Sequence, residues 1–361
     1  MPRFLTLVVQ DDAQTREHLA LIESRRDLAR ALVPKGYERY FQSRAVSRSA
    51  HGSVSIEGNP LDPESVQLAA LSGTGNDPAQ REAGNADRAQ RLMLRLASDR
   101  SLSIDVGLLR MFNSVLLERL PGQAAQQAGS FRRGGALIVN TATGQFVYTG
   151  PPAEWVAELM SGLVQQIAVW LRDDLPEIAA AKAHFGLVSI HPFADGNGRT
   201  ARLLADLILA QSRHHADGML SLSSVLRERR NEYYETLQAS QGSVFSERVD
   251  VTAFVRFHTA ALTDAVRQLE ARALVVQRSS SALKARFADL LNTRRIIGLL
   301  FILEVGPLTT SRYALVTSCS QPTALVDLND LCDAGLVIRQ GRGRATHYQL
   351  AAATRALMET A

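Results

Sequence analysis

One run of twelve residues constrains this chain more than any other segment: His191-Pro-Phe-Ala-Asp-Gly-Asn-Gly-Arg-Thr-Ala-Arg202. It places a histidine, an aspartate, two glycines and two arginines between two stretches whose apolar residues recur at helical spacing, about 177–190 and 200–212. Chance agreement at its eight specified positions is negligible, because each residue type occurs at roughly 5–7% or less. No packing role requires this mixture. A site that holds a polyphosphate and moves a proton would use every part of it.

The glycines of this run favour an anion-binding turn. Gly196-Asn197-Gly198 stands just before a predicted helix, and glycines let backbone N–H groups turn together and approach an anion closely. A helix N-terminus adds unpaired N–H donors and a partial positive charge, which together form a seat for phosphate. The run is not a Walker A loop, because the GxxxxGK[ST] spacing and its lysine are missing. The alternative for the glycines alone is a simple turn.

Charged residues around the turn supply the other parts of such a site. Arg199 and Arg202 are three residues apart and share a helix face, where two guanidiniums suit the β and γ phosphates of a nucleotide. Asp195 is a candidate Mg²⁺ ligand, since one carboxylate plus phosphate oxygens is the usual way this ion is held. His191 is the candidate base, because imidazole accepts a proton near neutral pH. The alternatives are a structural histidine and a helix cap at Asp195, and Phe193 is expected to anchor the loop in the core.

The run resembles the Fic family, whose signature H-x-F-x-[D/E]-G-N-G-R-x-x-R it matches at every position. The wider resemblance covers about residues 45–240. Gly129-Ser-Phe-Arg132 resembles the family's segment before its flap, and Pro151-Pro152 through Met160 resembles the segment after it. Arg230-Asn-Glu-Tyr-Tyr234 resembles the downstream R-x-x-Y-Y-x-x-L helix, although Arg229 stands where the family often has Asn.

This resemblance implies a fold and a reaction. The implied fold is mainly α, a helical Fic core with a small β-hairpin flap. The β-prone runs Ala136–Val139 and Gln145–Tyr148, with a turn at 141–144, independently predict that hairpin. The implied reaction transfers AMP from ATP to a Ser, Thr or Tyr hydroxyl of a target protein, or of the chain itself, with release of pyrophosphate. The target segment is expected to add as a strand to the 136–149 hairpin.

The resemblance also assigns roles to single residues. It implies a base at His191, a Mg²⁺ ligand at Asp195, an anion cradle at Gly196, Asn197 and Gly198 with Asn197 on the α-phosphate, and nucleotide or phosphate contacts at Arg199, Arg202 and Tyr234. Relatives with Lys at the position of Gly198 can act as protein kinases with an inverted nucleotide, so Gly198 favours nucleotidyl transfer. Base selection depends on pocket shape, which leaves UTP and GTP as alternative donors.

A second motif predicts a brake on the reaction. Ser53-Val-Ser-Ile-Glu57-Gly58 resembles the family's inhibitory motif [S/T]-x-x-x-E-[G/N] and ends a helix expected over about 37–58. A carboxylate in the last turn opposes the helix macrodipole by ~0.3–1 kcal/mol, so a tertiary cation would compensate it, and Arg202 is the candidate. Such a contact would occupy Arg202, which is the expected partner of the γ-phosphate. Ser53 lies four residues earlier on the same face. The alternative is an exposed glutamate at a frayed helix end.

The helical patterns divide the chain into three predicted regions. They are an N-terminal helical region over 1–100 with the inhibitory helix, a Fic catalytic core over 101–275, and a winged helix-turn-helix-like domain over 285–355. Gln277-Arg-Ser-Ser-Ser-Ala282 is the expected linker, and residues 73–87 are expected to be a loop or a weak helix start. In the last region, helical patterns over 294–303, 311–317 and 321–334 precede a strand, a loop and a strand over 335–350.

The C-terminal pattern raises a rival function, a DNA-binding regulator whose Fic-like part only senses nucleotide. The 321–334 helix would occupy the recognition position, with Arg339, Arg342 and Arg344 on the wing near phosphates. Residues 321–330 contain no Arg or Lys and are acidic toward their end, which favours docking of a target or subunit over DNA. A pure sensor would not need the base His191.

Composition adds few restrictions. A net charge of +4 permits a nucleic-acid contact without arguing for one, and 46% hydrophobic residues are ordinary for a soluble protein. The first ten residues have too short an apolar run for a signal peptide, and no apolar stretch approaches the ~18 residues of a membrane span. Cys319 and Cys332 form no CxxC pair, so a reducing cytoplasm is expected. The resemblance suggests a homodimer.

Overall fold

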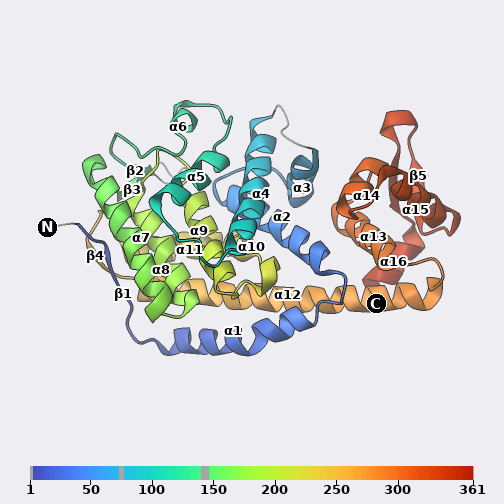
Figure 1. The fold of residues 1–361 in the computed structure, drawn as a ribbon, viewed down its shortest axis with the longest axis horizontal. Coiled ribbons are helices and arrows are strands. Elements are labelled where there is room, and N and C mark those ends of the chain that lie inside the picture. Colours follow the sequence, from blue (N-terminus) through green and yellow to red (C-terminus); the bar gives the residue numbers. More distant parts are fainter. Residues whose placement is uncertain (1–2, 73–76, 140–145, 361) are drawn as a thin grey trace.

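The computed structural model describes residues 3–72, 77–139 and 146–360, and within them the chain is mainly helical (Figure 1). The helices are α1 (Ala13–Ala31), α2 (Glu38–Ile56), α3 (Pro63–Ser72), α4 (Pro78–Ala97), α5 (Val106–Leu116), α6 (Gln123–Gln126), α7 (Val156–Asp173), α8 (Pro176–Ile190), α9 (Asn197–Gln211), α10 (Leu222–Glu228), α11 (Arg230–Gln241), α12 (Thr252–Phe287), α13 (Thr293–Val305), α14 (Thr310–Val316), α15 (Gln321–Asp333) and α16 (Ala352–Thr360). None of the helices described is long and apolar enough to cross a membrane.

The centre of the larger part of the molecule is the pair α8 and α9, which pack against each other. From Ala179 to Ile190 every residue of α8 is buried, and the alanines at 179–181 and 183 let neighbouring helices approach closely. A helix that is apolar on all sides is stable only inside a core. Helices α7 and α12 cover α8, while α4 and α5 cover α9, so the connection between α8 and α9 has a rigid base.

Among the described residues, three two-stranded sheets complete the fold. The predicted hairpin is present as β2 (Leu137–Val139) paired antiparallel with β3 (Phe146–Thr149), and it is called the flap hairpin below. Its predicted turn at 141–144 lies outside the described residues. Near the N-terminus, β1 (Thr6–Val8) pairs in parallel with β4 (Arg248–Asp250), a pairing that the sequence analysis did not predict.

Helix α4 corrects the expectation of a loop or weak helix start for residues 78–87, while residues 73–76 lie outside the described part of the chain. The structure has helix from Pro78, because Asp77 caps it by accepting from the backbone N–H of Gln80 and proline fits the first turn. The polar residues that suggested a loop are buried in part: Asn85 donates to the carbonyl oxygens of Leu116 and Glu118, at the end of α5. Helix α3 was also missed.

Helix α12 corrects the expected linker. Residues 277–282 lie inside this continuous helix of 36 residues, which runs under both parts of the molecule with α1 alongside it (Figure 1). Serine weakens a helix only slightly, and here tertiary contacts compensate. Ser279 is buried and its hydroxyl donates to the carbonyl oxygen of Met358 in α16, which packs on this end of α12.

The C-terminal module (residues 293–360) contains the three predicted helices, α13 to α15. They are followed by β5 (Val337–Gln340) and β6 (His347–Leu350), which pair antiparallel, and by α16. Figure 1 shows the module at the far end of α12 from the flap hairpin. The backbone of Leu308 exchanges two hydrogen bonds with Tyr348, which ties the segment before α14 to the hairpin.

Candidate functional site

The predicted site lies in the tight connection from α8 to α9, called the motif loop (residues 191–196). His191 ends α8 in the left-handed region with φ 50°, and Gly196 precedes α9 with φ 78°. Such a conformation costs a residue with a side chain ~1–3 kcal/mol and persists only where neighbours hold it. The loop therefore has a backbone shape that the surrounding helices impose.

Two asparagines hold this shape. The side-chain amide of Asn197 donates to the carbonyl of Phe193 and accepts from its N–H, both at 2.9 Å. Asn113 of α5 donates to the carbonyl of Asp195 and accepts from the N–H of Gly129. Phe193 is buried against Phe131, as expected for an anchor. The structure thus gives the side chain of Asn197 a loop-shaping contact, and its predicted α-phosphate contact stays a prediction.

His191 has the tautomer that a base requires. Its Nδ1 lies 3.3 Å from the carbonyl oxygen of Val188, and a carbonyl only accepts, so Nδ1 carries the proton of the neutral ring. This leaves the lone pair on Nε2. Burial lowers the pKa of His191, and the charge of Arg132 adds to this effect. The neutral imidazole is therefore the main form at pH 7.

A hollow adjoins this histidine. It is lined by His191, Phe193 and Ala194 from the motif side and by residues 132–138 and Gln127 from the segment leading into the flap hairpin. Exposed Arg133 and Leu137 lie at its rim, so an incoming chain segment would meet the base and the hairpin together.

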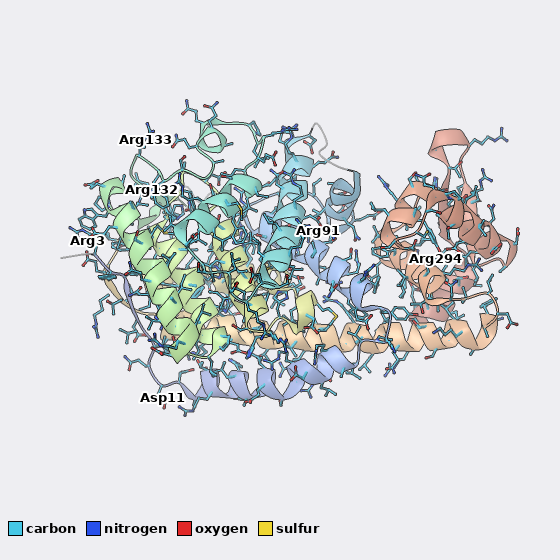
Figure 2. The ribbon with its side chains drawn as sticks, in the orientation of Figure 1. Arg3, Asp11, Arg91, Arg132, Arg133 and Arg294 are labelled. Carbon is cyan, nitrogen blue, oxygen red and sulfur yellow. The ribbon has the colours of Figure 1, made fainter. Side chains whose placement is uncertain are left out.

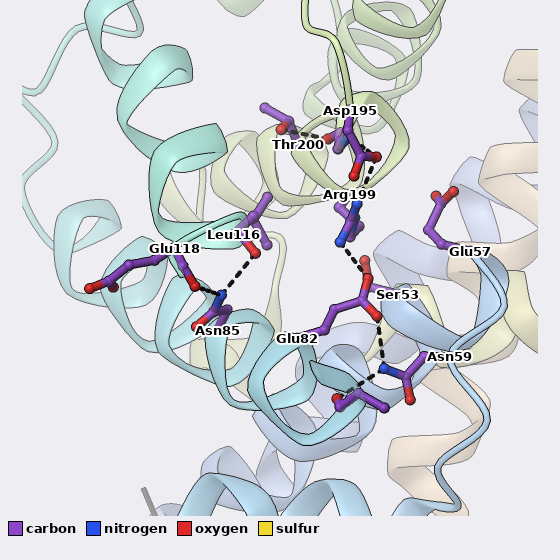
Figure 3. A network of polar contacts seen from close by, with 12 residues as sticks. Ser53, Glu57, Asn59, Glu82, Asn85, Leu116, Glu118, Asp195, Arg199 and Thr200 are labelled. Carbon is purple, nitrogen blue, oxygen red and sulfur yellow. Dashed lines mark hydrogen bonds and ion pairs between the residues drawn. The ribbon is translucent and has the colours of Figure 1, made fainter. Parts of the chain in front are cut away.

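The two arginines of α9 are both paired. Arg199 is buried and donates to Asp195 of the motif loop at 2.8 Å and to Glu82 of α4 (Figure 3). Glu82 was not singled out by sequence reasoning, because nothing near it distinguishes it from a surface glutamate. Its other oxygen accepts from Asn59, which continues the network toward the end of α2.

Asp195 fits the predicted metal role. Its side chain is 49% exposed, and both of its contacts, from Arg199 and from the N–H of Gly196, go to the same oxygen, Oδ1. Oδ2 is left for a ligand. The described residues include no cluster of three His, Cys, Asp or Glu side chains that could hold a metal ion. A Mg²⁺ ion here would therefore need phosphate oxygens and water, which is its usual coordination at nucleotide sites.

The predicted inhibitory residues lie on Arg202. This arginine is 2% exposed, and its Nη2 donates to Glu57 Oε1 at 2.6 Å and to the Ser53 carbonyl at 2.9 Å. Its Nε donates to Ser53 Oγ at 3.1 Å. Burial acts to lower the pKa of Arg202, but the charge and hydrogen bond of Glu57, together with Tyr233 and Tyr234, outweigh burial, so the pKa is raised. Glu57 lies at the exposed end of α2, but its ion pair with Arg202 holds it, so it is not a free glutamate at a frayed helix end.

Gly198 makes this contact fit. A Cβ atom at this position would lie 2.5 Å from Glu57 Oε1 and 3.0 Å from Arg202 Nη1. Atoms at such distances overlap, so any side chain at 198 would displace the carboxylate. Tyr234 lies at the same end of α2, where its hydroxyl donates to the Ile56 carbonyl at 3.2 Å beside Arg230. The structure thus places Tyr234 against the inhibitory helix, and its nucleotide contact stays a prediction.

Comparisons with known proteins agree with this geometry. Residues 103–209 match the Fic/DOC family. The chain contains a Fic domain. It is 32% identical over 217 residues to protein adenylyltransferase fic-1 of Caenorhabditis briggsae, covering 57% of this chain and 37% of that protein. Protein adenylyltransferase Fic of Drosophila yakuba is 27% identical over 258 residues, covering 68% and 47%. The chain thus spans less than half the length of these relatives.

Solved structures share the fold over more of the chain. A Fic family protein from Desulfovibrio desulfuricans G20 superposes with a TM-score of 0.60 at 25% identity, covering 95% of this chain and 97% of that one. Fic-1 from Caenorhabditis elegans gives a TM-score of 0.53 at 24% identity, covering 70% of each. The mainly helical Fic fold predicted from sequence is confirmed.

Proposed function

We propose that this protein transfers AMP from ATP to a hydroxyl side chain of a target protein, and to its own chain when no target is present. The observation that carries the proposal is the motif loop, which joins His191, whose Nδ1 faces the carbonyl of Val188, to the glycine-shaped N-terminus of α9. Similarity to proteins named protein adenylyltransferase supports this choice among Fic reactions.

The reaction follows from the positions of these groups. The acceptor oxygen attacks the α-phosphorus and forms an O–P bond, the bond to the β-phosphate oxygen breaks, and pyrophosphate leaves. Nε2 of His191 takes the hydroxyl proton. The N-terminal N–H groups of α9 and the guanidiniums of Arg199 and Arg202 bind phosphate oxygens. Mg²⁺ on Asp195 Oδ2 would neutralise charge on those oxygens.

The contact between Glu57 and Arg202 restrains this reaction. ATP needs the guanidinium of Arg202 for its γ-phosphate, and Glu57 occupies it, so ATP would bind in an unproductive pose. The brake is released when α2 withdraws this carboxylate.

The acceptor segment is proposed to dock on the flap hairpin and to reach His191 through the adjoining hollow. Leu137 is 68% exposed on β2, which offers an apolar contact to such a strand. A cytoplasmic location and a homodimer complete the proposal, the latter tested by analytical ultracentrifugation.

The rival role of the C-terminal module, DNA binding, has less support than protein docking. Helix α15 exposes Leu325 and Val326, each by about half, where a recognition helix would carry polar or basic side chains. Affinity for a DNA duplex that falls steeply with salt, in the absence of any transfer activity, would favour the rival.

The first test is incubation of a Glu57→Gly variant with Mg²⁺ and each α-labelled nucleoside triphosphate, followed by intact-mass measurement. A gain of one AMP is expected with ATP. A mass gain with UTP or GTP instead would identify that nucleotide as the donor. No gain from the variant and from an added host lysate would contradict transfer. The matched control is the same variant with His191→Ala.

A further inference from the structure

Arg132 links the base to the flap hairpin. It lies on the segment that enters the hairpin (Figure 2), and it is 6% exposed. Its Nε donates to the carbonyl of His191 at 2.7 Å, Nη1 to that of Gly134 at 2.6 Å, and Nη2 to that of Pro151 at 2.6 Å. These three carbonyls belong to the base itself, to the entry of the hairpin and to its exit.

The arrangement is specific to the guanidinium. A lysine has one nitrogen and cannot reach three carbonyls in different directions, whereas the planar fork of arginine can. The backbone reinforces the link, since the N–H of Arg132 donates to the carbonyl of Pro192 and Phe131 forms a bridge with Phe193. The backbone of His191 is in the left-handed region, which persists only where neighbours hold it. Because Arg132 holds the carbonyl of His191, we expect the direction of the ring to depend on Arg132.

We propose that Arg132 is a positioning residue that holds the imidazole of His191 and the flap hairpin in fixed relative positions. The distance and angle between the base and the docked acceptor hydroxyl then stay constant. This inference rests on the proposed transfer reaction. All three guanidinium nitrogens of Arg132 donate to backbone carbonyls, so its proposed role acts through His191 and the flap hairpin.

The test uses Arg132→Lys and Arg132→Met in the Glu57→Gly background. A displaced base slows the chemical step, so kcat should fall about 100-fold while the Kd for ATP stays unchanged. Ring ¹⁵N chemical shifts of His191 should change from the single Nδ1–H tautomer to a mixture in both variants. Arg172→Met, an exposed arginine in the last turn of α7 that does not line the hollow, is the matched control and should keep the tautomer.

The outcomes separate this inference from the function on which it rests. Unchanged kcat and an unchanged tautomer in folded variants would overturn the positioning role. A loss of ATP affinity as large as the fall in kcat would also overturn it, because Arg132 would then support the whole site and not only the base. If the Glu57→Gly parent shows no transfer, the proposed function fails, and the ¹⁵N shifts still decide whether Arg132 orients the ring.

A second, independent observation concerns the other end of the inhibitory helix. Glu304 of α13 accepts from the hydroxyl of Tyr40 at 2.6 Å and from Nε of Arg44 at 2.5 Å, both on α2. The Tyr40 ring packs edge-on against Phe301 of α13, with centroids 5.2 Å apart. The C-terminal module thus holds one end of α2, while Arg202 holds the other.

This junction contains more positive than negative charge. Arg48 follows Arg44 by one turn, and its Nε and Nη2 are buried without a hydrogen-bond partner among the described residues. Burial, with the charges of Arg272 and Arg44, lowers the pKa of Arg48 to about 9. The charge of Glu304 acts on Arg44, Arg48 and Arg272, and that of Glu228 also acts on Arg272, while two side chains of α2 donate to Glu304.

We infer that the module sets the strength of the brake through Glu304: a partner that shifts α13 would move α2 and withdraw Glu57 from Arg202. A helix transmits such a shift because it is stiff over the ~20 Å between residues 44 and 57. This inference also rests on the proposed reaction.

The test compares Glu304→Ala with Glu359→Ala, an exposed glutamate of the same module. Loosening α2 should raise self-modification by Glu304→Ala about tenfold, a usual size for coupling between sites. The same change in the Glu57→Gly background should have no further effect. Hydrogen exchange of residues 53–57 should quicken in Glu304→Ala and not in Glu359→Ala.

Two results would overturn the inference. One is an unchanged exchange rate at 53–57 in Glu304→Ala. The other is an equal gain in activity with and without Glu57, which would mean that Glu304 acts outside the brake. An inactive Glu57→Gly protein would reject the proposed function alone, since the exchange measurement needs no activity.

Discussion

Two pairs of arginines, one at the start of α9 and one at the start of α13, are held by carboxylates in different ways. Arg199 and Arg202 bind carboxylates from the motif loop and from other helices, α4 and α2. Arg294 and Arg295 bind Asp327 and Asp330 within the same small module. In the proposed reaction a phosphate would take the place of the carboxylate on Arg202. The second pair is held by Asp327, which is buried in the module, and by Asp330 at its surface.

The comparison shows why similar sequence features have different meanings. Asp327 is 1% exposed and also lies 3.4 Å from the Tyr313 hydroxyl, so its pair fixes how α13, α14 and α15 pack. Arg202 is as deeply buried, but Glu57 is 33% exposed and lies at a helix end. A buried cation whose partner is reachable from solvent is suited to exchange one anion for another.

The largest expected effect separates chemistry from charge pairing. His191→Ala in the Glu57→Gly background leaves both arginine pairs intact and removes the base, so the transfer rate should fall about 10²- to 10⁴-fold. Rates are measured with α-labelled ATP. Persistent labelling would remove His191 as the base.

The second effect tests the permanent pair. Asp327→Ala leaves two arginines without their buried partner and should lower the free energy of unfolding of the module by about 3 kcal/mol. Chemical denaturation measures this loss, and ATP should not restore it. If ATP restored the free energy of unfolding, the module and the nucleotide site would unfold as one cooperative unit.

The third effect tests the exchangeable pair. Glu57→Gly should raise self-modification about 10- to 100-fold, in the range of coupling energies between sites. It should also give ATP a larger increase in Tm than in the wild type, because phosphate then takes the place of the carboxylate. A smaller increase would mean that Glu57 and the γ-phosphate do not compete.

The smallest effect measures one hydrogen bond. Ser53→Ala removes the contact from Ser53 Oγ to Arg202 Nε and leaves the bonds from Nη2. A single bond contributes about 1 kcal/mol, so self-modification should rise about fivefold. Ser55→Ala, on the same helix, is the control. A rise as large as that of Glu57→Gly would place the main restraint at Ser53.

Sequence patterns predicted most of the helices, the flap hairpin and the motif loop, because each depends on local spacing or on a short motif. They also named Arg202 as the partner of Glu57, since a carboxylate at a helix C-terminus needs a cation. Other partners could not be foreseen. Glu82, the carbonyl acceptors of Arg132 and the junction at Glu304 exist only once distant helices pack together. For the same reason the serines at 279–281 indicated a linker where α16 keeps α12 helical.

Gly198 carries a consequence for how such a chain can change. Because Gly198 has a hydrogen atom where other residues have a Cβ atom, Glu57 has room to reach Arg202. A Cβ atom at this position would force the side chains of Glu57 and Arg202 to shift, so a substitution there is expected to weaken their contact. In the proposed reaction Gly198 is also part of the anion cradle, so one substitution would affect the regulatory contact and the phosphate seat together.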